Sequence, residues 1–210
     1  MRQQRPIMGW LVVLMASWFA ASGSRAECVA SSGAASAVLV ELYLPAGCAD
    51  CARAERWLES LDAIAVTLPA GAAEHVNRRR LLPRQRMALT PRPYVLLQGQ
   101  EFARWDKPEF EKARARVQAT PAKAHLRLAI LGAGDRALEV EVHGGGDGEL
   151  YLAAYRGHHI LDWEGPFALP HARHRLALPP GAGSAGTGVV AFVQDRRTKA
   201  VLQALRRATC

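Results

Sequence analysis

Two cysteines separated by two residues, Cys48 and Cys51, lie between a strand-like run and a helix-like run. Residues 37–43 before them are mostly valine, leucine and other apolar residues, and residues 52–61 after them place apolar side chains on one helix face. The N-terminus of a helix carries partial positive charge, which stabilises a thiolate, the reactive form of cysteine. This context predicts dithiol–disulfide chemistry in which Cys48 is the exposed nucleophile and Cys51 the resolving thiol.

The same spacing also fits a permanent structural disulfide or one half of a metal site. A zinc site needs two further ligands, but the sequence has no second cysteine pair, and His75 is the nearest histidine. The other histidine groups, at 158–159 and 171–174, lie beside polar or turn-like residues, which favours surface positions over metal ligation. The sequence therefore predicts no metal and no other cofactor.

The first 26 residues have the pattern of a secretory signal that is removed on export. Arg2 and Arg5 give a positive start, residues 7–20 form an apolar run, and small side chains at both ends of 24–26 fit a cleavage site after Ala26. The apolar run is short for a membrane span, so a retained anchor is the less favoured alternative. We expect a periplasmic or secreted protein with no stable membrane span after cleavage, in a compartment where disulfides persist.

The mature chain is modestly basic. Three of the 27 lysines and arginines belong to the signal, which leaves 24 against 19 aspartates and glutamates, whereas the whole sequence has a formal net charge of +8. This balance suits an exported protein and gives little support for nucleic-acid binding. The arginines at 78–80 fit a solvated helix face better than an anion site.

Residues 27–120 show the element order of a thioredoxin-like domain, which is strand, helix, strand, helix, strand, strand, helix. The expected strands are 38–44, 64–68, 94–98 and 101–105, and the expected helices are 52–61, 74–88 and 108–117. Such a domain is a mixed sheet flanked by helices.

A thioredoxin-like fold places a cis-proline before its third strand, facing the dithiol. Pro93 fits this position best because it directly precedes the strand expected at 94–98, and Pro91 is the alternative. We therefore predict that Pro93 and its neighbour Arg92 bind the substrate.

From Pro121 onward, strand-like runs alternate with glycine-rich turns and helix signals are scarce. The expected strands are 125–131, 137–143, 149–155 and 189–194. We expect residues 121–210 to form a smaller antiparallel β-sandwich-like domain that follows the α/β thioredoxin-like domain.

The other two cysteines stand at the ends of the mature chain. Cys28 is the second residue after the expected cleavage site, and Cys210 is the last residue. The termini of a compact unit often lie close together, which favours a structural disulfide between them. The alternative is a pair of unpaired thiols, a liability in an oxidising compartment.

These features favour an exported thiol–disulfide oxidoreductase whose partner is a protein or small molecule with a disulfide or thiol. No nucleophile-elbow, paired-carboxylate or phosphate-loop pattern stands out. The alternative is a non-catalytic periplasmic binding or assembly module, either a scaffold or a copper carrier that uses the two cysteines and a histidine.

Several segments also show a family pattern: residues 27–28, Val40-Glu41-Leu42-Tyr43 leading into Gly47-Cys48-Ala49-Asp50-Cys51, then 56–58, 90–105 and 201–210. Together they resemble the exported bacterial family catalogued as domain of unknown function 1223. The resemblance implies a thioredoxin-like domain followed by a β-rich domain, with a redox role. The chain departs from the family pattern at Ala52-Arg53, where the family has two prolines.

Overall fold

The computed structural model describes residues 28–69, 74–87, 92–130, 137–169, 173–177 and 186–209. The expected signal, residues 1–26, and Cys210 lie outside this part of the chain. The helices of the described part are α1 (Cys51–Glu59), α2 (Glu74–Arg80), α3 (Pro83–Met87) and α4 (Pro108–Gln118). Its strands are β1 (Cys28–Ser31), β2 (Leu39–Leu44), β3 (Ile64–Pro69), β4 (Tyr94–Leu97), β5 (Gln100–Glu101), β6 (Ala124–Ile130), β7 (Ala137–Gly144), β8 (Gly148–Arg156), β9 (His159–Ala168), β10 (Arg173–Ala177), β11 (Thr187–Asp195) and β12 (Val201–Ala208). None of these helices has the length and apolar character needed to cross a membrane.

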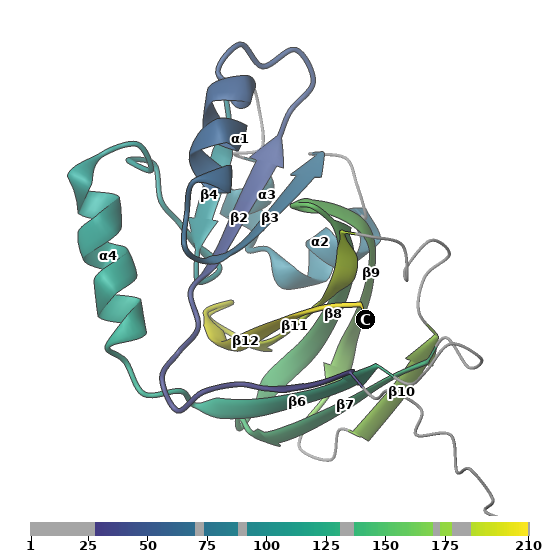
Figure 1. Cartoon of the computed structure of the whole chain (residues 1–210). Coiled ribbons are helices and arrows are strands. Elements are labelled where there is room, and N and C mark those ends of the chain that lie inside the picture. The colour runs from purple at the N-terminus through teal and green to yellow at the C-terminus, as the bar shows by residue number, and fades with distance from the viewer. Residues whose placement is uncertain are drawn as a thin grey trace, which may run out of the picture.

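Among the described residues, the largest element is an eight-stranded mixed sheet with the strand order β12-β11-β8-β9-β3-β2-β4-β5 (Figure 1). β2 runs parallel to β3 and antiparallel to β4, and β4 turns back into the short β5. β3 meets β9 through a parallel pairing of Thr67 with His159. A second sheet, of four antiparallel strands, has the order β1-β6-β7-β10. The chain is thus a mixed α/β fold with a large mixed sheet and few helices, in agreement with the α/β class predicted from the sequence.

The two regions expected as successive domains share the large sheet. β9, from the C-terminal region, continues the sheet beyond β3, and β1, from the N-terminal region, pairs with β6. β8 and β11 pack against β6 and β7 across one hydrophobic core, in which Leu128, Val140 and Ala191 are fully buried. The inner layer of the β-rich part therefore extends the sheet from which the two central cysteines emerge.

β2 is held on both faces, which fixes the position of the segment that follows it. Side chains alternate across a strand, so Val40 and Leu42 pack on one face while Tyr43 points to the other. α1 covers the first face with Ala54 and Leu58, which lie one helical turn apart and are fully buried. α4 lies on the same side as α1 (Figure 1).

The other face of the large sheet encloses a core that contains a buried ion pair. The sheet curls, so that α2 lies between β2–β4 and the strands β8 and β9 (Figure 1). Arg80, the last residue of α2, is fully buried, and its Nη2 lies 2.6 Å from Glu41 Oε2. Its Nη1 donates a 2.6 Å hydrogen bond to Tyr43 Oη, and its guanidinium lies 4.7 Å from the centre of the Trp163 ring. These contacts fasten α2 to β2 and to the β-rich part.

The single helix predicted over residues 74–88 is wrong, because α2 and α3 are separate helices. Pro83 has no N–H to donate to a preceding turn, and its ring disfavours the helical conformation at Leu82. The solvated face predicted for the arginines at 78–80 is correct for Arg78 and Arg79, which are exposed. Arg80 is the exception, because it points into the core and pairs with a buried carboxylate.

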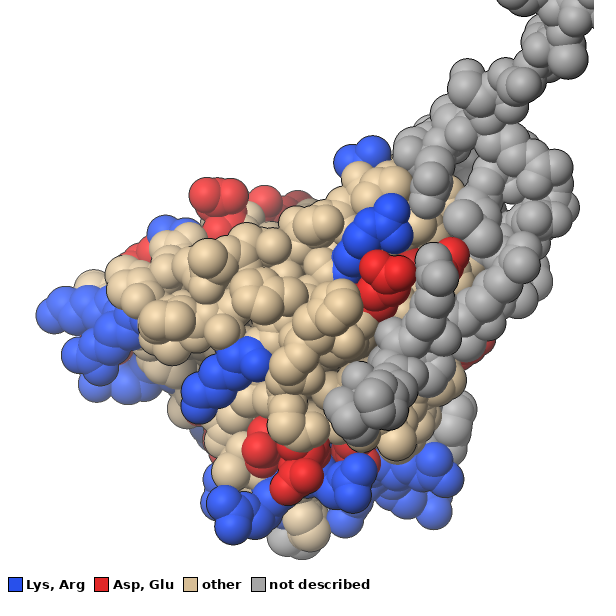
Figure 2. Space-filling model, turned by 90° about the horizontal axis from the view of Figure 1, so that it is seen from below, with Lys and Arg blue, Asp and Glu red and all other residues tan. Residues whose placement is uncertain are grey.

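Charged side chains on the face beneath β6 and β7 are dispersed. Figure 2 shows lysines and arginines of the described part scattered around a broad uncharged area, with acidic side chains beside several of them. Nucleic-acid binding relies on a continuous basic patch or stripe, and this face has none among the residues drawn in colour.

Candidate functional site

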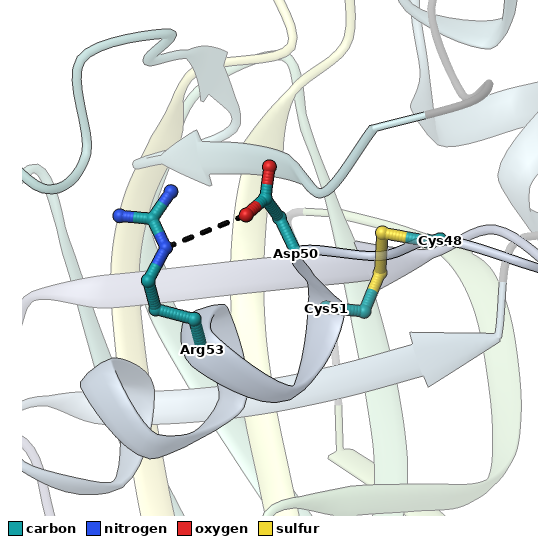
Figure 3. Close-up of a disulfide and its surroundings, with 4 residues drawn as sticks. All are labelled: Cys48, Asp50, Cys51 and Arg53. Atoms are coloured by element: carbon teal, nitrogen blue, oxygen red, sulfur yellow. Dashed lines mark ion pairs between the residues drawn. A yellow bond between two sulfur atoms is a disulfide. The ribbon is translucent and has the colours of Figure 1, made fainter.

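Cys48 and Cys51 form a disulfide at the point where β2 gives way to α1 (Figure 3). The Cα atoms of the two residues are 5.5 Å apart, and both side chains are partly exposed. α1 begins at Cys51, one residue before the helix start predicted from the sequence. The pair therefore lies at the carboxyl end of β2 and at the N-terminus of the helix that covers it.

The backbone before α1 places the cysteine pair at the N-terminus of the helix. Gly47 has a φ of +71°, a left-handed conformation that glycine adopts without a steric penalty, and this turn leads from β2 into the cysteine pair. Asp50 is the N-cap, but its side chain makes no capping hydrogen bond. The Ala54 N–H donates the first helical hydrogen bond, 3.1 Å, to the Asp50 carbonyl. The N–H groups of the first turn thus present the positive end of the helix dipole to Cys51.

Arg53 links the cysteine loop to the segment between β5 and α4. Its Nε lies 3.6 Å from Asp50 Oδ1 (Figure 3), and its Nη1 donates a 2.9 Å hydrogen bond to Asp106 Oδ2. The guanidinium also lies 4.8 Å from the centre of the Trp105 ring. The hydrogen bond from Arg53 lowers the pKa of Asp106, and the same bond raises the pKa of Arg53. The Asp50 carboxylate, which opposes thiolate formation next to it, is therefore partly neutralised by Arg53.

A cleft of about 560 Å³ opens beside this network. Its lining includes Asp50 and Arg53 from the start of α1, Arg92 and Pro93 from the segment before β4, and Trp105 from the segment after β5. The two cysteines do not line the cleft, and Asp50 connects them to it. The cleft thus brings together Arg92 and Pro93, the predicted substrate-binding residues, and Asp50, one of the two residues between the cysteines and about forty positions earlier in the sequence.

The expectation of a cis bond at Pro93 is wrong. In the described part of the chain the cis peptide bond is that between Gly165 and Pro166, and the Arg92–Pro93 bond is trans. The trans isomer before proline is intrinsically favoured by about 0.5–1 kcal/mol, and the local sequence contains nothing that specifies the other isomer. The alternative, Pro91, lies outside the described residues.

Cys28 is the first residue of β1, with an exposed fraction of 1%, and it is disulfide-bonded rather than free. Its predicted partner, Cys210, lies outside the described residues, so the pairing of these two cysteines stays a prediction.

The histidines of the described part lie in separate places: His125 pairs with His143 across β6 and β7, and His158 and His159 lie at the turn between β8 and β9. His159 is exposed and its Nε2 lies 4.0 Å from Glu55 Oε1 on α1. His171 and the side chains of His75 and His174 lie outside what the structure describes. Within the described ranges, no group of three or more histidine, cysteine, aspartate or glutamate side chains is arranged to hold a metal ion. The copper-binding alternative therefore gains no support from the described part of the chain.

Sequence reasoning missed the contacts of Arg53 with Asp50, Trp105 and Asp106 beside the cysteine loop. Arg53 follows Asp50 by three positions, a spacing that brings side chains together on a helix, so this pair had a local signal. The contacts of Arg53 with Trp105 and Asp106 join segments about fifty residues apart. No local pattern in the sequence indicates such contacts.

No family model matches the chain, and neither curated proteins nor solved structures gave a match. The resemblance to the exported bacterial family therefore stays a prediction, and a function has to be argued from the geometry of the site.

Proposed function

We propose that this protein is an exported, thioredoxin-like thiol–disulfide oxidoreductase that uses Cys48 and Cys51. The observation that carries the proposal is the partly exposed disulfide at the N-terminus of α1, at the carboxyl end of β2. A dithiol in this position is favoured for exchange, because the helix dipole stabilises the thiolate that attacks or leaves.

The arrangement around β2 supports the thioredoxin-like part of the proposal. The strand order β3-β2-β4-β5, with β2 parallel to β3 and antiparallel to β4, follows the element order expected of that fold. α1 and α4 cover one face of these strands, and α2 covers the other (Figure 1). The β-rich part continues the same sheet and would contribute to the choice of partner.

The chemistry balances as a two-electron exchange. A substrate thiolate attacks Cys48 Sγ, the bond between the two cysteine sulfurs breaks, and Cys51 leaves as a thiolate. A second substrate thiolate attacks the mixed disulfide, and Cys48 leaves in turn. The substrate has then lost two electrons and two protons, and the protein is the dithiol. The reducing direction reverses these steps, with Cys48 attacking a substrate disulfide and Cys51 resolving the intermediate.

Export is part of the same proposal. The signal pattern in residues 1–26 and the resemblance to an exported family both support a periplasmic or secreted protein, where disulfides form and persist. The partner in that compartment is a protein or small molecule with a disulfide or thiol.

Trapping the mixed disulfide tests the proposal. Reduced Cys51→Ala protein is expected to form a stable mixed disulfide with an added disulfide substrate, because Cys48 attacks and no resolving thiol follows. The matched Cys48→Ala variant, which keeps the other cysteine, is expected to trap far less. A native pair that resists excess dithiothreitol, or equal trapping by both variants, would show a structural disulfide and overturn the proposal.

A further inference from the structure

The charges around the cleft are unequally neutralised. Arg53 is shared by Asp50 and Asp106, and Glu101 accepts a 3.3 Å hydrogen bond from Tyr94 Oη. Arg92, by contrast, is exposed and lines the cleft without an ion pair or hydrogen bond to any described residue. It is the guanidinium in this lining that is left to pair with a ligand.

We propose that this cleft selects substrates that carry a carboxylate beside the reacting disulfide or thiol, and that Arg92 is the residue that pairs with it. The inference rests on the proposed function and names its substrate class. Asp50 lies between the two cysteines and lines the same cleft as Arg92, so the proposal places the carboxylate of a substrate bound through Cys48 in this cleft. Guanidinium groups bind carboxylates in a bidentate geometry. The volume of about 560 Å³ lies within the range of small-molecule pockets.

Nearby acids do not cancel this preference. Asp50 and Asp106 share Arg53, and Asp106 also lies 3.7 Å from Lys107 Nζ. A ligand carboxylate therefore meets two acids that are paired with two cations on that side, and an unpaired guanidinium at Arg92. The rim is exposed, so the preference is moderate and weakens as salt is added. We expect loss of the Arg92 charge to lower the preference for anionic over cationic substrates about threefold, and reversal of the charge to lower it about tenfold.

Three disulfides of similar length test the proposal: 3,3′-dithiodipropionate with two carboxylates, bis(2-hydroxyethyl) disulfide with none, and cystamine with two ammonium groups. The rate at which each oxidises the reduced protein is measured at low ionic strength and divided by its rate with free dithiothreitol. The anionic-to-cationic ratio is expected to exceed one for the wild type. It is expected to fall about threefold in Arg92→Ala and to drop below one in Arg92→Glu.

The matched control is Arg56→Glu, which makes the same change of net charge at an exposed position on α1 outside the cleft lining. An Arg92→Glu ratio equal to that of Arg56→Glu overturns the proposal.

Disulfide-linked peptides with aspartate or asparagine beside the cysteine form a second arm of the experiment. A larger charge preference for the peptides than for the small disulfides identifies a protein substrate, and the reverse identifies a small one. Failure of the proposed function is distinguishable, since the neutral disulfide then does not react either.

Discussion

The buried ion pair between Arg80 and Glu41 predicts a large effect of single substitutions on stability. Both side chains have an exposed fraction of 0%, so removing one leaves the other charge without a counter-ion in the core. Breaking a buried pair in this way costs about 3–5 kcal/mol. Glu41→Gln falls at the lower end, because the amide oxygen still accepts a hydrogen bond and Arg80 keeps its 2.6 Å bond to Tyr43 Oη. Glu41→Met removes the hydrogen-bond acceptor as well as the charge, so its loss of stability falls at the upper end of this range.

The double variant Glu41→Met/Arg80→Met is expected to recover most of this loss. The native pair is incompletely compensated, since Glu41 Oε1 and Arg80 Nε have no hydrogen-bond partner in the described structure. Methionine at 80 retains contact with the rings of Trp163 and Phe192, which the guanidinium now covers at 4.7 and 4.9 Å. The double variant should therefore lie within about 2 kcal/mol of the wild type, far from the roughly 6–10 kcal/mol that additive losses would give.

Urea unfolding of the wild type, Glu41→Met, Arg80→Met and the double variant measures this coupling, with circular dichroism and tryptophan fluorescence as independent probes. Tyr43→Phe is the control, because it removes one hydroxyl and leaves the pair, and should cost about 1 kcal/mol. If the single variants do not fold, recovery of a folded double variant still demonstrates the coupling. Single losses under about 1 kcal/mol, or a double variant as unstable as the sum, would refute the reasoning.

Three further predictions concern the site and its surroundings. Asp50→Asn should lower the pKa of the nucleophilic thiol, because it removes a carboxylate beside it, and alkylation rate against pH measures the shift; an unchanged profile contradicts the electrostatic role of this residue. Gly99→Ala should cost roughly 2–4 kcal/mol in urea unfolding, because φ is +72° and an added Cβ would lie 2.2 Å from the Lys199 carbonyl oxygen. Arg53→Gln should raise the pKa of Asp106 toward its ordinary value in an NMR titration. Since folding lowers the pKa of Asp106, its contribution to stability is present above the unfolded pKa and is lost as the pH falls through the folded one.

The elements around the cysteine pair could be predicted because their patterns are local and mutually consistent. The apolar run at 38–44 is β2, and the helical face after the cysteines is α1. Here the spacing of the apolar residues, the turn at Gly47 and the burial of the apolar side chains all favour a strand, a turn and a helix in this order. The split at Pro83 was also readable from the sequence, since proline restricts the residue before it, and the single helix predicted there overlooked that signal.

Two strands of the large sheet could not be predicted, because their local pattern conflicts with their final state. β12 has the sequence VLQALRRA, whose leucine, alanine and arginine residues favour a helix. It is a strand because it pairs along its length with β11. β9 is mostly exposed or half-buried and contains Gly165-Pro166, so it lacks the alternation that indicates a strand. Both strands form because of pairing with distant segments of the chain. The two expected domains share one sheet because β9 pairs with β3.

The contrast between the two sets of charges explains how one strand can serve both stability and recognition. Glu41 lies within β2 and pairs with Arg80 where neither side chain is exposed to solvent or salt. Asp50, six residues beyond the end of the same strand, is more than half exposed and pairs with Arg53, which is also exposed. Salt screens exposed pairs strongly and buried pairs weakly. The interior pair therefore keeps β2 attached to α2 at salt concentrations that screen the exposed pairs. The rim charges remain able to exchange partners, as the proposed binding and release of a carboxylate substrate requires.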